Sequence, residues 1–205
     1  GFDPAKKQAP RLYTFKNILN FFDLYAAGDH IWVNGGQLFD PVSGALRDVP
    51  GSFRENNVGD NGFFAKDRNG TLWWASHYFL YRLDSSENKF EWIKELELPE
   101  KVFNKTEALH SGTKSGKLLI SFMGKLLQYD PKTKMLRSFD PTDWGLPVTR
   151  ITVIEEERSG QLWLGTDAGL VHVNPANGAV RRYTVSDGLP NNFICGLLTE
   201  GDSCL

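Results

Sequence analysis

Apolar and polar residues alternate in short runs along this chain, and these runs predict β-strands. In the clearest stretch, residues 149–155 form a run rich in β-branched side chains, and a polar turn follows that ends at Gly160. Three further strands are predicted at 162–165, 170–173 and 179–185, separated by clusters of Gly, Asn, Asp and Pro. The pattern therefore predicts a four-stranded antiparallel meander.

The same unit returns about every 44 residues. A tryptophan after a turn marks it at Trp32, Trp73 and Trp163, and Leu119 takes this place in the remaining copy. A second marker recurs at Asp3, Asp40, Asp84, Asp130 and Asn174. Two markers that move together indicate an array of supersecondary units. Four-stranded units of this length, with aromatic residues making up 13% of the chain, fit the blades of a β-propeller.

Helical segments are not expected. The best candidate, at 91–105, is interrupted by Pro99, and its apolar positions do not form one stripe. The predicted fold class is therefore all-β, with four complete blades and a partial blade at either end.

One propeller region is expected over residues 1–205. Its predicted parts are 2–15 (partial), 18–52, 58–97, 106–140, 148–185 and 192–205 (partial). Because a half blade leaves backbone groups unpaired, we expect the chain to be part of a larger propeller. Closure of these residues into a four-bladed ring is the less favoured alternative.

Several short motifs occur in a fixed order within one repeat and allow comparison with known families. Residues 159–192 contain Leu-Trp-Leu-Gly-Thr, then Gly-Leu, Asn-Pro and Asp-Gly-Leu-Pro-Asn-Asn. This order resembles the two-component regulator propeller repeat. The units around Trp32 and Trp73 match it less closely, and the unit around Leu119 matches it least.

The resemblance implies a sensor rather than an enzyme. Members of this family are propellers on the periplasmic or extracellular side of the membrane in two-component or hybrid regulators. They often sense glycan fragments and dimerise to pass the signal on. The histidine kinase of such a parent protein lies outside a region like this one. Ligand binding would then shift the balance between two sensor arrangements through differential affinity.

Charge and composition exclude some partners. The chain has 25 acidic and 23 basic side chains and a net charge of −2, so no general attraction to nucleic acid is expected. No apolar run is long enough for a membrane helix. The surplus of Lys and Arg over 101–140 suggests an acidic partner or, preferably, a charged outer strand that protects a sheet edge. In the predicted hairpin, Cys204 pairs near Thr199 rather than opposite Cys195, so a disulfide between the two cysteines is not favoured.

Candidate chemistry is sparse. The four histidines, at 30, 77, 110 and 172, have no metal-ligand spacing, and no cofactor or metal is predicted. The run 155–157 is interpreted as the solvated end of a strand. The stretch 67–71 resembles calcium loops and the Asp boxes of sialidases. Its spacing recurs at 157–160, so we interpret both stretches as one repeated structural turn.

The loops at one face of a propeller commonly carry its ligand site. These are the links between blades and the turns between the second and third strands. Aromatic residues among amide and charged groups would suit a sugar, through ring stacking and hydrogen bonds to hydroxyls. The predicted ligand-binding residues are Arg54, Asn57, His77, Tyr78, Trp144, Asp167, Asn191 and Asn192.

Two other functions stay open. A lyase-type propeller that resembles streptogramin lyase would need a His, a Glu and a metal at the channel mouth. A structural or protein-docking propeller would show an exposed apolar patch on the loop face and no response to glycans. The fold alone does not decide among these functions.

Overall fold

Four four-stranded antiparallel sheets form the framework of the computed structural model in the residues that it describes. The structure describes residues 24–27, 30–33, 37–49, 62–76, 79–84, 89–93, 106–111, 115–147, 150–200 and 203–204. Within these residues it contains strands, turns and two short 3-10 helices, so the all-β prediction is confirmed.

Each sheet is a simple meander in which consecutive strands pair. Sheet 1 comprises β1 (Leu24–Ala27), β2 (His30–Val33), β3 (Gln37–Phe39) and β4 (Leu46–Asp48). Sheet 2 comprises β5 (Phe63–Lys66), β6 (Leu72–Ser76), β7 (Phe79–Asp84) and β8 (Lys89–Trp92). Sheet 3 comprises β9 (Thr106–Ser111), β10 (Leu118–Phe122), β11 (Lys125–Asp130) and β12 (Met135–Phe139). Sheet 4 comprises β13 (Ile151–Glu156), β14 (Leu162–Thr166), β15 (Gly169–Asn174) and β16 (Ala179–Tyr183).

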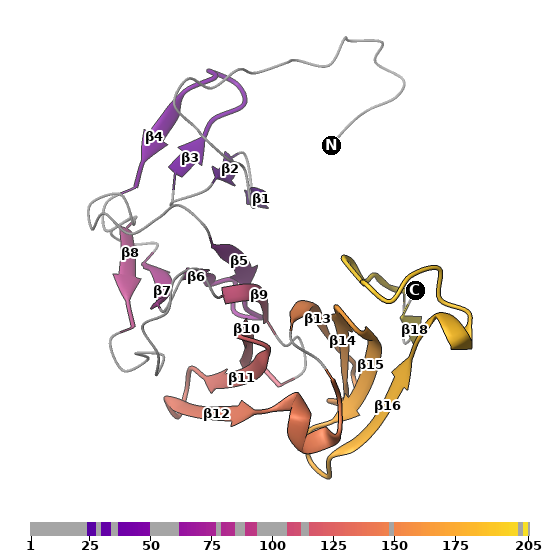
Figure 1. The fold of residues 1–205 in the computed structure, drawn as a ribbon. Helices are drawn as coiled ribbons and strands as arrows, with labels where there is room; N and C mark the ends of the chain where they lie inside the picture. Colours follow the sequence, from indigo (N-terminus) through magenta and orange to yellow (C-terminus); the bar gives the residue numbers. More distant parts are fainter. Residues whose placement is uncertain are drawn as a thin grey trace.

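The sheets follow one another along an arc. Figure 1 shows the first strands, β1, β5, β9 and β13, on the inner side of this arc and the fourth strands on its outer side. The strands β9 and β13 lie close together, as do β5 and β9. A two-stranded hairpin, β17 (Thr199–Glu200) with β18 (Ser203–Cys204), follows sheet 4. In it Cys204 pairs with Thr199, as predicted, and Cys195 is a free, exposed thiol.

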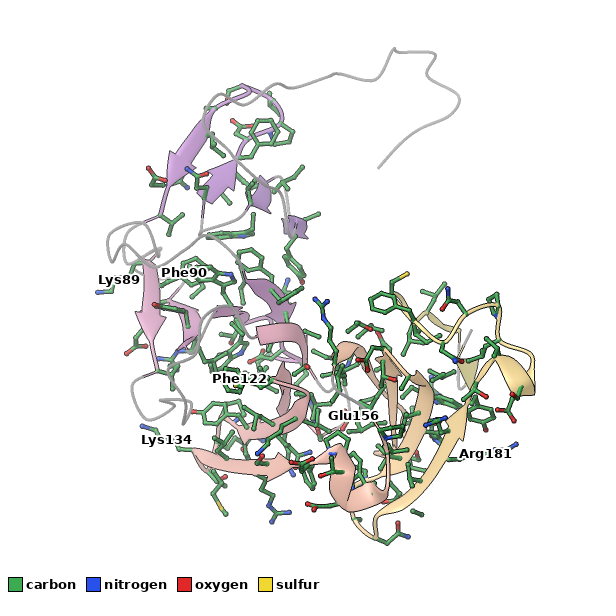
Figure 2. All side chains as sticks on the ribbon, in the orientation of Figure 1. Lys89, Phe90, Phe122, Lys134, Glu156 and Arg181 are labelled. Carbon is green, nitrogen blue, oxygen red and sulfur yellow. The ribbon has the colours of Figure 1, made fainter. Side chains whose placement is uncertain are left out.

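The hydrophobic core is divided among the three interfaces between neighbouring sheets. Neighbouring positions on one strand face opposite interfaces, since side chains alternate across a sheet. Trp74 is fully buried towards sheet 1. Its ring lies 5.8 Å from that of Phe90 on β8, which in turn meets Trp32 of sheet 1 edge to face at 5.3 Å. Trp73 is buried towards sheet 3, where it meets Tyr129 edge to face at 6.3 Å. Phe90 is labelled in Figure 2 within the first of these aromatic groups.

The turn between the first two strands is built in the same way in sheets 2 and 4. Asp67 Oδ1 accepts hydrogen bonds from the backbone N–H of Asn69 and of Thr71, each over 2.9 Å. Its Oδ2 accepts one from the indole Nε1 of Trp73, also over 2.9 Å.

In sheet 4, Glu157 accepts from Ser159 Oγ over 2.8 Å and from Trp163 Nε1 over 2.7 Å. The glycines at 70 and 160 donate equivalent backbone hydrogen bonds to residues 67 and 157, each over 2.9 Å. The interpretation of both stretches as one repeated structural turn is confirmed.

Candidate functional site

The inter-sheet links and one set of turns meet at the same end of sheets 3 and 4. Leu126 at the start of β11 pairs with Phe139 at the end of β12, and Leu170 of β15 pairs with Tyr183 of β16 in the same way. The loop face is defined here as residues 123–124, 140–147, 150, 167–168 and 184–198. Figure 1 shows the two 3-10 helices of this face following β12 and β16.

The first link contains the 3-10 helix η3 (Pro141–Trp144). Asp140 caps it, accepting from Thr142 Oγ1 over 2.6 Å and from Thr142 N over 3.0 Å. These hydrogen bonds, aided by the nearby charge of Lys125, hold the pKa of Asp140 below its usual range. Trp144 is half-buried, and its ring packs against that of Phe139 at 6.0 Å. The link is therefore rigidly anchored, with part of the Trp144 ring on the surface.

The turn between β14 and β15 is tied to the link that enters β13. Asp167 Oδ1 accepts a hydrogen bond from Arg150 N over 3.2 Å, and Asp167 N donates to Arg150 O over 3.2 Å. One carboxylate oxygen of this half-buried residue thus has a structural partner.

The second link contains η4 (Val185–Asp187), closed by a capping box between Thr184 and Asp187. The side-chain oxygen of Asn192 accepts from Val185 N, and that of Asn191 accepts from Phe193 N, each over 2.9 Å. Among the described residues, the amide Nδ2 groups of Asn191 and Asn192 have no hydrogen-bond partner. These amide N–H groups can therefore donate to a ligand while the side-chain oxygens of both asparagines remain bonded to backbone N–H groups.

The link then crosses the end of sheet 4. Ile194 N donates to Thr166 O over 3.0 Å, and the hydroxyl of Thr152 donates to Ile194 O and, over 3.1 Å, to Gly165 O. These contacts bring Asp167, Asn191 and Asn192 to the same end of sheet 4, with Trp144 on the preceding link. Arg54, Asn57, His77 and Tyr78 lie outside the described residues, so their predicted role stays a prediction.

Comparison with known proteins rests on the fold alone. No protein-family model and no curated protein matches the chain. Among solved structures it is similar to the extracellular domain of BT4673 from B. thetaiotaomicron, with a TM-score of 0.67 and 20% identity over 86% of this chain and 24% of that one. One structure of that domain describes a one-component system and another a hybrid two-component system. The extracellular domain of BT3049, described as a hybrid two-component system from the same organism, matches with a TM-score of 0.63 and 16% identity over 86% of this chain and 25% of that one.

The chain is also similar to a structure of known architecture. The β-propeller domain of Cps50 (Swd1) from Myceliophteria thermophila matches with a TM-score of 0.55 and 15% identity, over 89% of this chain and 61% of that one. The fold is that of a β-propeller. The fold class predicted from the repeats is confirmed, and the chain spans about a quarter of the length of the two extracellular domains.

In this propeller the inner strands carry one group of ionisable side chains. His110 Nδ1 on β9 lies 3.9 Å from Glu155 Oε1 on β13. Glu156 is buried and accepts from Ser115 N over 3.2 Å, so the expectation of a solvated run at 155–157 is wrong for this residue, which packs where the two sheets meet. Figure 2 labels Glu156 where sheets 3 and 4 meet. Burial lowers the pKa of His110, although the charge of Glu156 opposes this, and burial raises the pKa of Glu155.

These groups do not make a metal centre. Within the part of the chain that the structure describes, no three His, Cys, Asp or Glu side chains are arranged to hold a metal ion. In the same residues, no helix is long and apolar enough to cross a membrane.

A second feature of the propeller was not predicted from the sequence. A cavity of about 220 Å³ lies between sheets 1 and 2, lined by Tyr25, Trp32, Lys66, Asn69, Gly70, Thr71, Leu72 and Leu83. One difference between the repeats could have indicated the cavity. The residue before the repeated acidic residue is Leu83 in sheet 2 and the larger Tyr129 in sheet 3. This difference indicates a cavity only if the neighbouring sheet that packs on the position is known, and the alternation along one strand does not identify that sheet.

Proposed function

We propose that this chain is the ligand-sensing propeller of a two-component or hybrid two-component regulator and that it does not itself catalyse a reaction. The observation that carries the proposal is the likeness to the extracellular domains of BT4673 and BT3049 over 86% of the chain. The repeat motifs at 159–192, which resemble the two-component regulator propeller repeat, support it independently. The proposed location is periplasmic or extracellular, and the output domain is a histidine kinase elsewhere in the parent protein.

The ligand is proposed to be a glycan or another small polar molecule bound at the loop face. Asn191 and Asn192 offer amide donors there, Trp144 offers part of an aromatic ring, and Asp167 is a further member of the proposed site. Such groups suit hydroxyl-rich ligands, because donors bind the hydroxyls and the ring covers an apolar sugar face. Arg54, Asn57, His77 and Tyr78 belong to the same proposed site. Binding would favour one of two arrangements of a homodimer and so transmit the signal.

A glycan-binding screen with one matched pair of variants tests this proposal. Asn191→Ala removes a loop-face side chain whose oxygen accepts a hydrogen bond from Phe193 N. Asn177→Ala removes the same local interaction at the opposite end of sheet 4, where Asn177 accepts from Ala179 N over 3.0 Å. Calorimetric titration with oligosaccharides should show weaker binding for Asn191→Ala alone. Equal affinities in both variants would exclude Asn191 from the site, and a screen without any binder would contradict glycan sensing.

One observation favours a second candidate, protein docking. Val185, Phe193 and Leu198 are large apolar residues on the loop face, and 50%, 48% and 68% of their surface is exposed. Exposed apolar groups of this kind are typical of surfaces that bind another protein segment. A Phe193→Ser variant that keeps glycan binding but loses dimerisation or docking would assign this patch to a protein partner.

A further inference from the structure

The cavity between sheets 1 and 2 lies at the end of the sheets opposite the loop face. Tyr25 and Trp32 line it from sheet 1. From sheet 2, Lys66 at the end of β5, the turn at 69–71 and the aliphatic Leu72 and Leu83 complete the lining. At about 220 Å³ it is smaller than the roughly 300–1,000 Å³ typical of sites for drug-sized ligands, so its occupant is about one ring in size.

The next interface shows why the cavity exists. Between sheets 2 and 3, Trp73 is covered edge to face by Tyr129, which directly precedes Asp130. Between sheets 1 and 2, Trp32 occupies the place of Trp73, and Leu83 directly precedes Asp84. Leu83 is smaller than tyrosine and carries no ring. The missing aromatic group leaves the space that the cavity occupies.

The polar groups of the lining are not engaged elsewhere. Among the described residues, the side-chain polar atoms of Lys66, Asn69 and Thr71 have no hydrogen-bond partner. Asp67 is not part of the lining, and its carboxylate accepts from two backbone N–H groups and from Trp73. Among the described residues, the lining therefore includes one ammonium group, one amide and the hydroxyls of Thr71 and Tyr25, and it includes no carboxylate.

This combination defines the ligand by its chemistry. The Lys66 ammonium suits a carboxylate, Asn69 and Thr71 suit hydroxyls, and the rings of Tyr25 and Trp32 suit the apolar face of a sugar. We propose that the cavity between sheets 1 and 2 binds a single carboxylated sugar of the uronic acid class, with Lys66 as the carboxylate partner. This site is distinct from the proposed site at the loop face and does not depend on it.

The test uses glucuronic and galacturonic acid as probes, with glucose and galactose as uncharged controls. Leu83→Tyr fills the cavity in the way that Tyr129 fills the next interface. Lys66→Gln removes the charge from an exposed side chain, and Lys132→Gln removes an exposed charge from a turn outside the cavity as a matched control. Circular dichroism checks the fold of each variant, and calorimetric titration measures binding.

The wild-type chain and Lys132→Gln should bind a uronic acid about tenfold more tightly than the matching neutral sugar, as expected for one charge-assisted hydrogen bond. Lys66→Gln should lose this preference, and Leu83→Tyr should lose binding altogether. Unchanged uronic acid binding in Lys66→Gln would overturn the proposal, as would the absence of binding to the wild-type chain. If Leu83→Tyr does not fold, Lys66→Gln alone decides.

Failure of this inference and failure of the proposed function can be told apart. Asn191→Ala changes only the loop face and should leave uronic acid binding unaltered. Oligosaccharide binding that depends on Asn191 but not on Lys66 would support the proposed function and overturn the second site. Loss of uronic acid binding in Asn191→Ala, with unchanged binding in Lys66→Gln, would also overturn the second site, because it would assign the uronic acid to the loop face.

Discussion

The indole N–H of Trp163 donates a hydrogen bond to Oε1 of Glu157, six residues earlier, over 2.7 Å. The same relationship joins Trp73 to Asp67. In sheet 3 the tryptophan position is Leu119, and the residue six positions earlier in the sequence is Thr113 rather than an acid. In sheet 1 the residue six positions before Trp32 is Ala26, so the tryptophan also occurs without the acid. Where the acid is present, it accepts from the indole and bonds within the turn, which indicates a structural role rather than a ligand contact.

Removal of the acid should destabilise the sheet through the indole. Asp67→Ala leaves the N–H of Trp73, a residue that is only 3% exposed, without its acceptor, and two backbone N–H groups lose theirs. We expect a loss of about 1–3 kcal/mol in the free energy of unfolding, measured by urea denaturation. The exposed Asp143 is the control, and Asp143→Ala should change stability by no more than about 0.5 kcal/mol. Equal losses in both variants would contradict the structural role of Asp67.

A double-mutant cycle isolates the pair in sheet 4. Glu157→Ala removes the acceptor of the hydrogen bond, Trp163→Phe removes its donor, and the double variant removes both. We expect a coupling free energy of about 0.5–3 kcal/mol between the two sites. Additive effects would mean that each residue stabilises the sheet through other contacts, such as the stacking of Trp163 on His172 at 4.3 Å.

His172 contributes to the same cluster and needs a cycle of its own. Its Nε2 lies 2.9 Å from Glu157 Oε1, although the ring nitrogen has no aligned hydrogen-bond partner among the described residues. The contact is therefore a close approach of the two side chains without the alignment of a directed hydrogen bond. Repeating the cycle in a His172→Gln background separates the two contributions.

Two glycines with positive φ should respond differently to alanine. Gly169 has a φ of 127°, and a Cβ there would collide with the carbonyl oxygen of Tyr183 across β15 and β16. Gly178 has a φ of 71°, and a Cβ there would meet nothing within 4 Å. Gly178→Ala should lower the free energy of unfolding by about 1–2 kcal/mol, from the left-handed backbone alone. Gly169→Ala should lower it by more, and thermal denaturation that ranks the two equally would contradict the close approach of β16 to Gly169.

Protonation of His110 should weaken the fold as the pH falls. Burial lowers its pKa below the ordinary value of 6.5, so between these two values the native state binds fewer protons than the unfolded chain. The stabilising contribution is therefore present above about pH 6.5 and is lost as the pH falls through the folded pKa, by at most about 1.4 kcal/mol per pH unit.

Urea denaturation of the wild type and His110→Gln at about pH 7.5 and 5.5 tests this. The wild type should lose more stability than the variant over this interval. Glu155 acts with the opposite sign, because a raised carboxyl pKa stabilises the native state as the pH falls towards its ordinary value of 4.5. A Glu155→Gln background removes that contribution. If stability in this background changes with pH equally with and without His110→Gln, His110 is not the source of the pH dependence.

The sequence predicted the elements that repeat and missed the places where the repeat departs from itself. The spacing of Trp73 and Trp163 from their acids was enough to identify a structural turn, since the same local geometry occurs twice in one chain. Leu83 stands where the equivalent position of the next repeat is Tyr129, and this difference changes nothing in the pattern of its own strand. Its effect arises only when the neighbouring sheet brings Trp32 against it, and burial against another sheet is not encoded in the alternation of one strand.

The candidate ligand residues show the same limit. Asn191, Asn192 and Asp167 were predicted from their place in links and turns, and the structure brings them to one end of sheet 4. That the oxygens of both asparagines are already occupied by the backbone could not be predicted from composition. Which atoms remain for a ligand is decided by the conformation of the link, and the capping box at Thr184 sets that conformation.

The turns at Asp67 and Glu157 have an evolutionary consequence. Each turn satisfies its polar atoms with residues of its own repeat, while cohesion between neighbouring repeats comes chiefly from apolar side chains. The polar groups of these turns therefore stay satisfied when a repeat of this kind is duplicated, deleted or exchanged. Genes for such chains can therefore change length in whole modules, and each new copy is free to diverge at the few positions that face its neighbour.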